Sequence, residues 1–160
     1  MRVMQLGFAA TLLLPQTLPQ DRLAQYKTQF EHEKDPVRKA KLIVKLGAPE
    51  FEAIRRQVQA GNLDEALDQL GTYRDECVST YQSLKATGAN PEQKPAGFKQ
   101  FQISLRESLN RLTEILAGLP GDEQRPFAEI QNQLEGLDGQ LIRDLFPRQP
   151  RSNAKDNSKP

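Results

Sequence analysis

The chain of 160 residues contains one cysteine, one histidine and no tryptophan. Because a disulfide needs two thiols, the single cysteine excludes any disulfide within the chain. Metal and haem sites built on several cysteines or histidines are excluded for the same reason. A di-iron site of the helical-bundle type is excluded as well, because it needs two Glu-x-x-His elements. The sequence therefore predicts no metal site and no cofactor.

A large excess of one charge is also missing. The 22 basic and 21 acidic residues leave a formal net charge of +1. Proteins that bind nucleic acids through the phosphate backbone normally have a strong basic excess, so we expect no nucleic-acid partner. The longest apolar run, Met1 to Leu14, is about a dozen residues and falls short of the ~20 that a membrane-spanning helix requires.

This N-terminal run is typical of an export signal. Arg2 precedes it, and its length fits the hydrophobic region of a signal peptide. No small-x-small cleavage pair follows directly, because the segment Leu14-Pro15-Gln16 intervenes. We predict that residues 1–20 are a signal peptide and that the protein is exported to the periplasm or the extracellular space. The alternative is an N-terminal arm on a cytoplasmic protein.

Apolar residues recur every three or four positions along the rest of the chain, which predicts an all-α fold. The expected elements are a short helix at 21–34 and long helices at 36–60, 63–87, 97–118 and 122–146. Each long segment spans ~37 Å at 1.5 Å per residue, and matched lengths favour an antiparallel bundle of four long helices. The bundle domain is expected at 21–146. The tail, 147–160, lacks apolar periodicity and is predicted to be disordered and basic.

The segment 36–60 is interrupted by Gly47-Ala48-Pro49. Val44, Phe51 and Val58 nevertheless remain seven residues apart across the interruption. A turn between two helices would reset this phase, so the pattern favours one helix kinked at Pro49.

The segment 63–87 carries the clearest core stripe. Leu63, Leu70, Cys77 and Leu84 fall seven apart and predict the innermost edge of the bundle. Cys77 is therefore expected to be a small buried core residue. Asn62, just before this stripe, is expected to cap the helix.

Charge differs between these two segments. Residues 35–60 carry six cations and three anions, whereas residues 63–88 carry two cations and five anions. Opposite signs on consecutive antiparallel helices predict ion pairs between their flanks. The basic run 34–45 could instead contact anionic lipid headgroups.

Catalytic motifs are not found. The sequence has no His-Glu-x-x-His, no Gly-x-Ser-x-Gly and no phosphate-binding glycine loop. The carboxylates follow helix-surface spacing, and no apolar segment sets a pair of them apart. His32, between Glu31 and Glu33, is expected to face solvent. We predict no catalytic residue and no enzyme, although a carboxyl pair of the glycosidase kind stays open from sequence alone.

The most distinctive local pattern is a cluster of two cations and two aromatic residues at the entrance to the fourth long helix. Its members, Lys94, Phe98, Lys99 and Phe101, follow the long connection 88–97. Two interpretations fit. The rings could plug the end of the bundle while the lysines stay in water, or the four residues could form a lip that binds an anion or a peptide.

Two resemblances bear on the fold. The stretch Ala60 to Leu70 resembles the middle of a tetratricopeptide repeat, with Gly61, Ala66 and Leu70 at matching positions. That likeness covers one turn and half a helix, and it implies a helical hairpin and a role in protein interaction. The motifs of the second resemblance are Asp35-Pro36, Lys45-Leu46-Gly47, Tyr73-Arg74-Asp75-Glu76 and Lys94-Pro95-Ala96-Gly97-Phe98.

These motifs together are similar to uncharacterised exported bacterial helical proteins, over about 36–146. No activity is known for that group, so the resemblance implies nothing catalytic. The sequence thus favours a non-enzymatic interaction or scaffolding module of the cell envelope, with another protein as partner. The alternative is a helical bundle that binds a small ligand through 88–101.

Overall fold

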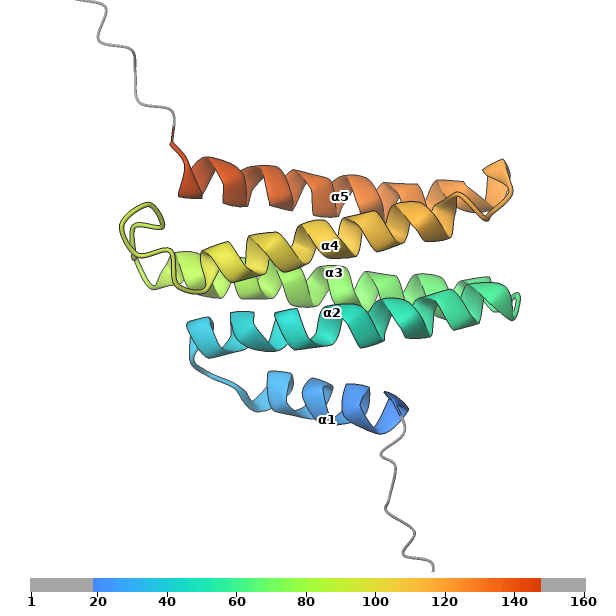
Figure 1. Ribbon diagram of the computed structural model, residues 1–160, viewed down its shortest axis with the longest axis horizontal. Helices are drawn as coiled ribbons and strands as arrows, with labels where there is room; N and C mark the ends of the chain where they lie inside the picture. Colours follow the sequence, from blue (N-terminus) through green and yellow to red (C-terminus); the bar gives the residue numbers. More distant parts are fainter. Residues whose placement is uncertain (1–18, 148–160) are drawn as a thin grey trace, which may run out of the picture.

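The computed structural model describes residues 19–147 (Figure 1). This part of the chain contains five α-helices and no strand, which confirms the predicted all-α fold class. The predicted helix boundaries lie within two residues of the observed ones. The predicted signal peptide and tail lie outside the described residues, except for 19, 20 and 147. The helices are α1 (Pro19–His32), α2 (Pro36–Gln59), α3 (Leu63–Ala86), α4 (Phe98–Leu116) and α5 (Gly121–Leu145).

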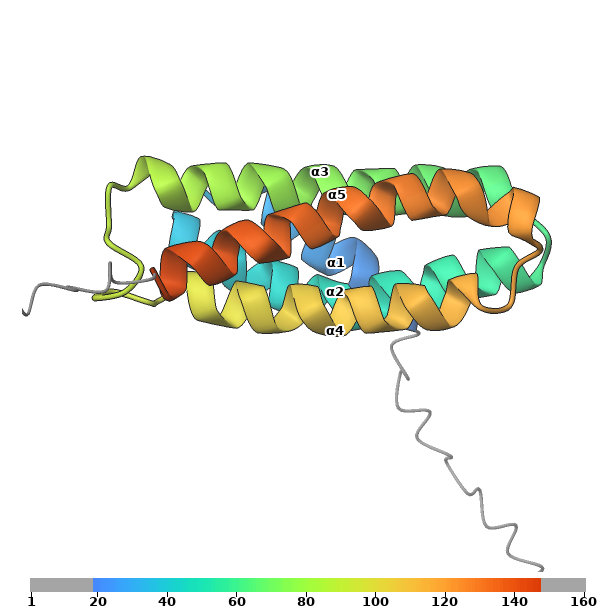
Figure 2. The same cartoon turned by 90° about the horizontal axis from the view of Figure 1, so that it is seen from above.

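The helix pairings place α1 apart from the rest. Helix α2 packs against α3 and α4, and α5 packs against the same two helices. Helix α1 packs against α2, on the side away from α5 (Figures 1 and 2). These pairings do not by themselves establish an antiparallel four-helix bundle or a kink at Pro49. Both features stay predictions. None of the helices within 19–147 is both long and apolar enough to cross a membrane.

The core stripes of α3, α4 and α5 follow the predicted spacing. On α3, Leu70, Cys77 and Leu84 are at most 1% exposed, which confirms the predicted burial of Cys77. Every apolar residue that the spacing assigns to the core of the two C-terminal helices is buried. These residues are Phe98, Phe101, Leu105, Leu109, Leu112, Leu116, Phe127, Ile130, Leu134, Leu137, Leu141 and Leu145.

Helix α2 runs unbroken through Gly47-Ala48-Pro49, so the prediction of one helix is confirmed. Its predicted stripe is wrong at one end, because Val44 is 41% exposed whereas Phe51 is 1% exposed. Seven-residue steps drift by ~20° per heptad on a straight α-helix, so Val44 falls at the solvent edge of the stripe. The buried line passes instead through Ile43, Gly47, Glu50 and Ile54.

The α2–α3 connection is a tight turn. Gly61 adopts φ +79°, a left-handed conformation that suits glycine at the end of a helix. Asn62 occupies the N-cap position of α3, yet its side chain makes no capping hydrogen bond. The Asn62 amide donates instead to Oε1 of Gln57 at 2.9 Å. The predicted N-cap position of Asn62 is therefore confirmed, but its side chain does not make the hydrogen bond that usually caps a helix.

The predicted ion pairs between α2 and α3 are also wrong, since none joins these two helices within residues 19–147. The cations of α2 turn toward other helices. Lys39 lies 4.5 Å from the ring centroid of Phe30, and Lys45 lies 5.7 Å from that of Tyr26, both on α1. The ion pairs that join different helices are Lys27–Glu50 (2.9 Å), Arg55–Glu114 (3.0 Å), Lys85–Asp144 (3.1 Å) and Arg106–Asp138 (3.1 Å).

Candidate functional site

A glutamate lies in the core line of α2. Glu50 follows Ile43 by seven residues and Gly47 by three, so the helix directs it inward, and it is 0% exposed. A charged side chain is almost never fully buried without a partner. Nζ of Lys27, on α1, donates to Oε1 of Glu50 at 2.9 Å. The cation that compensates this carboxylate therefore comes from the outer helix.

A second carboxyl group, that of Glu76 on α3, is close enough for the charges of Lys27 and Glu50 to act on it. Oε2 of Glu50 and Oε2 of Glu76 are both buried and have no hydrogen-bond partner. Burial raises the pKa of Glu76 from 4.5 to about 7, the Lys27 charge lowers it, and the Glu50 charge raises it. Near neutral pH, Glu76 is thus divided between its neutral and ionised forms. Glu50 and Glu76 are called the acid pair below.

Neutral polar groups pack on the core side of these helices. The hydroxyl oxygens of Tyr73 and Ser108 lie 2.8 Å apart. Gly47 makes room for them, because a Cβ atom there would lie 3.1 Å from Oγ of Ser108 and 3.7 Å from Oη of Tyr73. Burial raises the pKa of Tyr73 well above 10 and also raises the pKa of the Cys77 thiol. Both groups therefore stay neutral near pH 7, and among these groups it is Glu76 whose charge changes near neutral pH.

A pocket of about 540 Å³ continues the surface on which α1 lies. Helix α1 has 14 residues and α2 has 24, so α1 covers only part of α2, and α1 does not extend over the last turns of α2. Lys27 borders both this pocket and the acid pair. We call this pocket the α1 groove; its lining is Leu23, Ala24 and Lys27 of α1, Ala53, Arg56, Gln57 and Ala60 at the end of α2, and Gln69 of α3.

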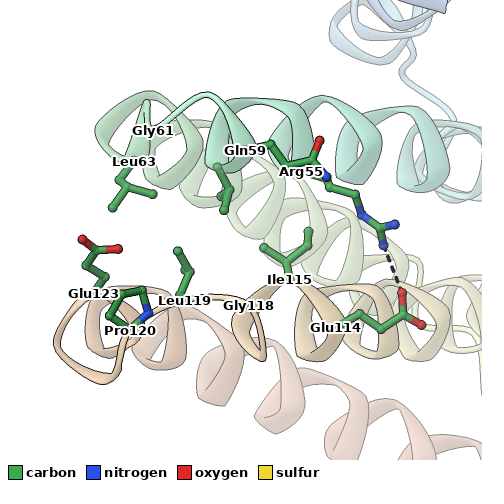
Figure 3. Close-up of a pocket in the computed structure, with 11 residues that line it drawn as sticks. Arg55, Gln59, Gly61, Leu63, Glu114, Ile115, Gly118, Leu119, Pro120 and Glu123 are labelled. Atoms are coloured by element: carbon green, nitrogen blue, oxygen red, sulfur yellow. Dashed lines mark hydrogen bonds and ion pairs between the residues drawn. The ribbon is translucent and has the colours of Figure 1, made fainter.

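A second pocket of about 540 Å³ lies between the α2–α3 turn and the α4–α5 turn (Figure 3). The ion pair of Arg55 with Glu114, at 3.0 Å, spans one side of it, and Glu123 lies on the other side (Figure 3). Its remaining lining is mainly apolar: Val58, Leu63, Ile115, Leu119 and Pro120, with Gln59, Gly61 and Gly118.

The basic run 34–45 lines a smaller pocket of about 420 Å³ between the end of α1 and the start of α2. Arg38 lies 3.6 Å from Glu33 and 3.9 Å from Asp35, so part of this charge is neutralised within the chain. His32 is exposed, as the sequence predicts. The lining residues are Gln29, His32, Glu33, Arg38, Lys41, Leu42 and Lys45.

The four residues of the predicted lip divide into two kinds. Phe98 and Phe101 are 1% and 0% exposed, whereas Lys94 and Lys99 face solvent. This is the arrangement of the first interpretation, in which the rings plug the end of the bundle. None of the three pockets is lined by a residue of 88–101. Binding at this lip stays a prediction, and only its lysines are accessible.

The acid pair corrects one expectation from the sequence. The expectation that the carboxylates keep to helix-surface spacing, with no pair set apart, is wrong for Glu50 and Glu76. The available clue was the place of Glu50, which is seven residues after Ile43 and four before Ile54, on a core line. Within residues 19–147, no group of three or more histidine, cysteine, aspartate or glutamate side chains is placed to hold a metal ion.

No protein-family model, curated protein or solved structure matches this chain. The fold and the site therefore define the class of the protein. Over residues 19–147 it is an all-α protein in which a fully buried glutamate is paired with a lysine from an outer helix, and a second, partly buried carboxyl group lies beside this ion pair. Both resemblances drawn from the sequence stay predictions.

Proposed function

We propose that this chain is a non-enzymatic interaction module of the cell envelope, which binds a helix of another protein in the place that α1 occupies in the free chain. The observation that carries the proposal is the complete burial of Glu50 with Lys27 of α1 as its cation. The four long helices, as the predicted antiparallel bundle kinked at Pro49, serve as the rigid scaffold.

The energetics of this ion pair favour a functional role. Removing two charges from water costs several kcal/mol per ion in typical proteins, and apolar residues of similar volume often do as well or better. The fold therefore does not need Glu50 for stability alone. Of the side chains described on α1, only Phe30 is buried, at 5% exposed. Release of α1 thus exposes little core and frees a surface on α2.

The geometry fits the recognition mode in which an amphipathic helix lies in a groove. Leu23, Tyr26, Lys27 and Phe30 of α1 fall at positions i, i+3, i+4 and i+7, which form one helical face. The α1 groove extends this surface past the first turns of α1. A partner helix longer than α1 would fill both the place of α1 and the α1 groove.

Site-specific photo-crosslinking in the native cells tests the proposal. A photoreactive residue is placed at Ala53 or Gln57, in the α1 groove, or at Asn132, an exposed position on α5, as the matched control. We expect one partner to crosslink to the groove positions and not to the control. The variant Phe30→Ala, which loosens α1, should increase the yield. Equal crosslinking from groove and control positions would contradict the proposal.

The location in the cell envelope depends on the apolar run Met1 to Leu14, which follows Arg2. Mass spectrometry of the full-length gene product recovered from its native cells reads the mature N-terminus. A chain shortened by about 20 residues in the envelope fraction is expected. An uncleaved chain in the cytoplasm would contradict export.

A second candidate function is the binding of a small ligand. The pocket in Figure 3, at about 540 Å³, falls in the size range of ligand pockets and combines an apolar floor with charged sides. Ligand-induced thermal shifts test it, with Val58→Trp to fill this pocket and Lys94→Ala/Lys99→Ala to test the predicted site at 88–101. A ligand whose shift survives both changes would contradict both sites.

A further inference from the structure

The acid pair has more hydrogen-bonding capacity than the free chain uses. An ammonium group carries three donors, and two carboxylates offer four oxygen atoms. Lys27 donates to Oε1 of Glu50, whereas Oε2 of Glu50 and Oε2 of Glu76 are buried without a partner. Unsatisfied buried polar atoms are uncommon in native proteins, and a water, an ion or a polar group that binds beside them usually satisfies them.

We infer that the acid pair is a binding site for a primary ammonium group, which Lys27 occupies in the free chain and a lysine of the partner helix occupies in the complex. The inference depends on the proposed function only for the source of the second ammonium. The site itself is a property of Glu50 and Glu76 and is testable on the isolated chain.

The chemistry selects an ammonium group over other cations. A structural zinc site takes four protein ligands, and no third histidine, cysteine, aspartate or glutamate side chain in 19–147 joins these two carboxyl groups. Lys27 already shows the fit of an ammonium, at 2.9 Å from Glu50 with its side chain 28% exposed. The remaining charges that act on Glu76 are those of Glu31 on α1, which raises its pKa, and Lys39 on α2, which lowers it.

The residues around Lys27 on α1 indicate which sequence pattern a partner helix needs. Relative to Lys27, the apolar residues of α1 lie at i−4 (Leu23), i−1 (Tyr26) and i+3 (Phe30), and all three pack against the core. A competing helix needs the same pattern around one lysine. Near Arg56, which lines the α1 groove, an acidic side chain on the preceding turns of that helix would be complementary.

Chemical rescue tests the ammonium site. Lys27→Ala removes the ammonium and leaves Glu50 without its cation, so we expect the melting temperature to fall by roughly 10 °C. n-Propylammonium chloride should restore most of that loss. Tetramethylammonium chloride at the same ionic strength has no N–H donor and should restore little. Lys34→Ala, which removes an exposed lysine, is the matched control and should respond equally to both salts.

Two further variants keep the test decisive. Lys27→Met retains an apolar stem, and it replaces Lys27→Ala if the alanine variant does not fold. Lys27→Ala/Glu50→Gln removes the buried charge together with the ammonium, so its melting temperature should no longer respond to n-propylammonium. Equal rescue by both salts, or rescue that persists in Lys27→Ala/Glu50→Gln, would overturn the ammonium site.

The outcomes for the site and for the proposed function are separate. Selective rescue without crosslinks from Ala53 or Gln57 would retain the ammonium site and reject the partner helix. Crosslinks without selective rescue would retain the interaction module and reject the ammonium site. A crosslinked product with twice the mass of the chain would overturn a second protein as the source of the lysine, because the occupant would then be a second copy.

Discussion

The hydroxyl groups of Tyr73 and Ser108 lie 2.8 Å apart and join α3 to α4 inside the core. Neither group can reach water, because Tyr73 is 0% and Ser108 is 2% exposed. The Ser108 hydroxyl therefore depends on Tyr73 for this hydrogen bond, whereas the Tyr73 hydroxyl also interacts with the Cys77 thiol. Gly47 leaves room for this contact, since a Cβ atom there would press on Oγ of Ser108 at 3.1 Å.

Removing one of these two hydroxyl groups should lower the free energy of unfolding by more than half of the loss caused by removing both. Tyr73→Phe or Ser108→Ala alone leaves a buried hydroxyl without a partner, which costs about 1–3 kcal/mol of unfolding free energy. The double variant leaves no unpaired hydroxyl, so its loss should fall short of the sum by about 1 kcal/mol. Urea unfolding of the four proteins measures this difference. Strictly additive losses would show that the two hydroxyl groups do not interact.

The pH dependence of stability should carry a contribution from Glu76. Burial raises its pKa from 4.5 to about 7, so between these values the folded chain binds more protons than the unfolded chain. This contribution to the free energy of unfolding is present below pH 4.5 and is lost as the pH rises through about 7. The full effect would be about 3 kcal/mol, and because Glu76 is partly exposed, screening by solvent reduces it to roughly 1–2 kcal/mol.

The variant Glu76→Gln isolates this contribution, because it cannot ionise. Urea unfolding at pH 5 and at pH 7.5 should show that the wild-type chain loses more stability between these values than the variant does. The groups that act on Glu76 (Lys27, Lys39, Glu31 and Glu50) are the same in both chains. An identical pH dependence in the two chains would contradict the raised pKa.

Much of the fold could be predicted because burial of apolar side chains imposes a period on each helix. The steps from Phe127 to Leu145, for example, follow this period without exception. The candidate site could not be predicted in the same way. A glutamate in a helix is usually solvated, and the burial of Glu50 depends on Lys27, 23 residues earlier, which sequence spacing cannot place beside it.

The charge pattern shows a second reason why side-chain contacts could not be predicted from the sequence. Net charges of opposite sign on α2 and α3 describe whole helices, but an ion pair needs two side chains on facing edges. Lys39 and Lys45 lie on aromatic rings of α1, and Arg55 turns to Glu114 of α4. The position of α1 against α2, which the sequence did not indicate, determines the contacts of Lys39 and Lys45.

Gly97 should tolerate no side chain. Its φ of +86° is a left-handed conformation, and a Cβ atom would lie 2.8 Å from Cδ2 of Leu84 and 3.5 Å from Cα of Val37. Gly97→Ala therefore combines backbone strain with a clash, and we expect it to destabilise the fold by roughly 2–4 kcal/mol. Thermal unfolding measures the loss. Unchanged stability would show that the connection before α4 can move away from Leu84.

Gly136, in α5, should tolerate a side chain, unlike Gly97. It is exposed in the middle of the helix, and a Cβ atom there would meet nothing within 4 Å. Gly136→Ala should stabilise the protein by about 0.5–1 kcal/mol, because alanine loses less backbone entropy than glycine in a helix. The same thermal unfolding experiment applies. A loss of stability would indicate that this face of α5 is covered by a contact outside residues 19–147.

The thiol of Cys77 should react only when the core opens. Cys77 is 0% exposed, and burial raises its pKa, so both access and the thiolate needed for alkylation are limited. We expect iodoacetamide to label the native chain orders of magnitude more slowly than the urea-unfolded chain. The matched control, Cys77→Ser/Asn132→Cys, carries an exposed thiol on α5 and should react at the rate of the unfolded chain.

When the opening and closing of the core are fast, the labelling rate of Cys77 reports the population of the open state. Gly97→Ala should therefore increase this rate by about tenfold for each 1.4 kcal/mol of stability lost. Native labelling of Cys77 at the rate of the control would contradict the packing of α3 against α2 and α5, because that packing is what separates the thiol from water.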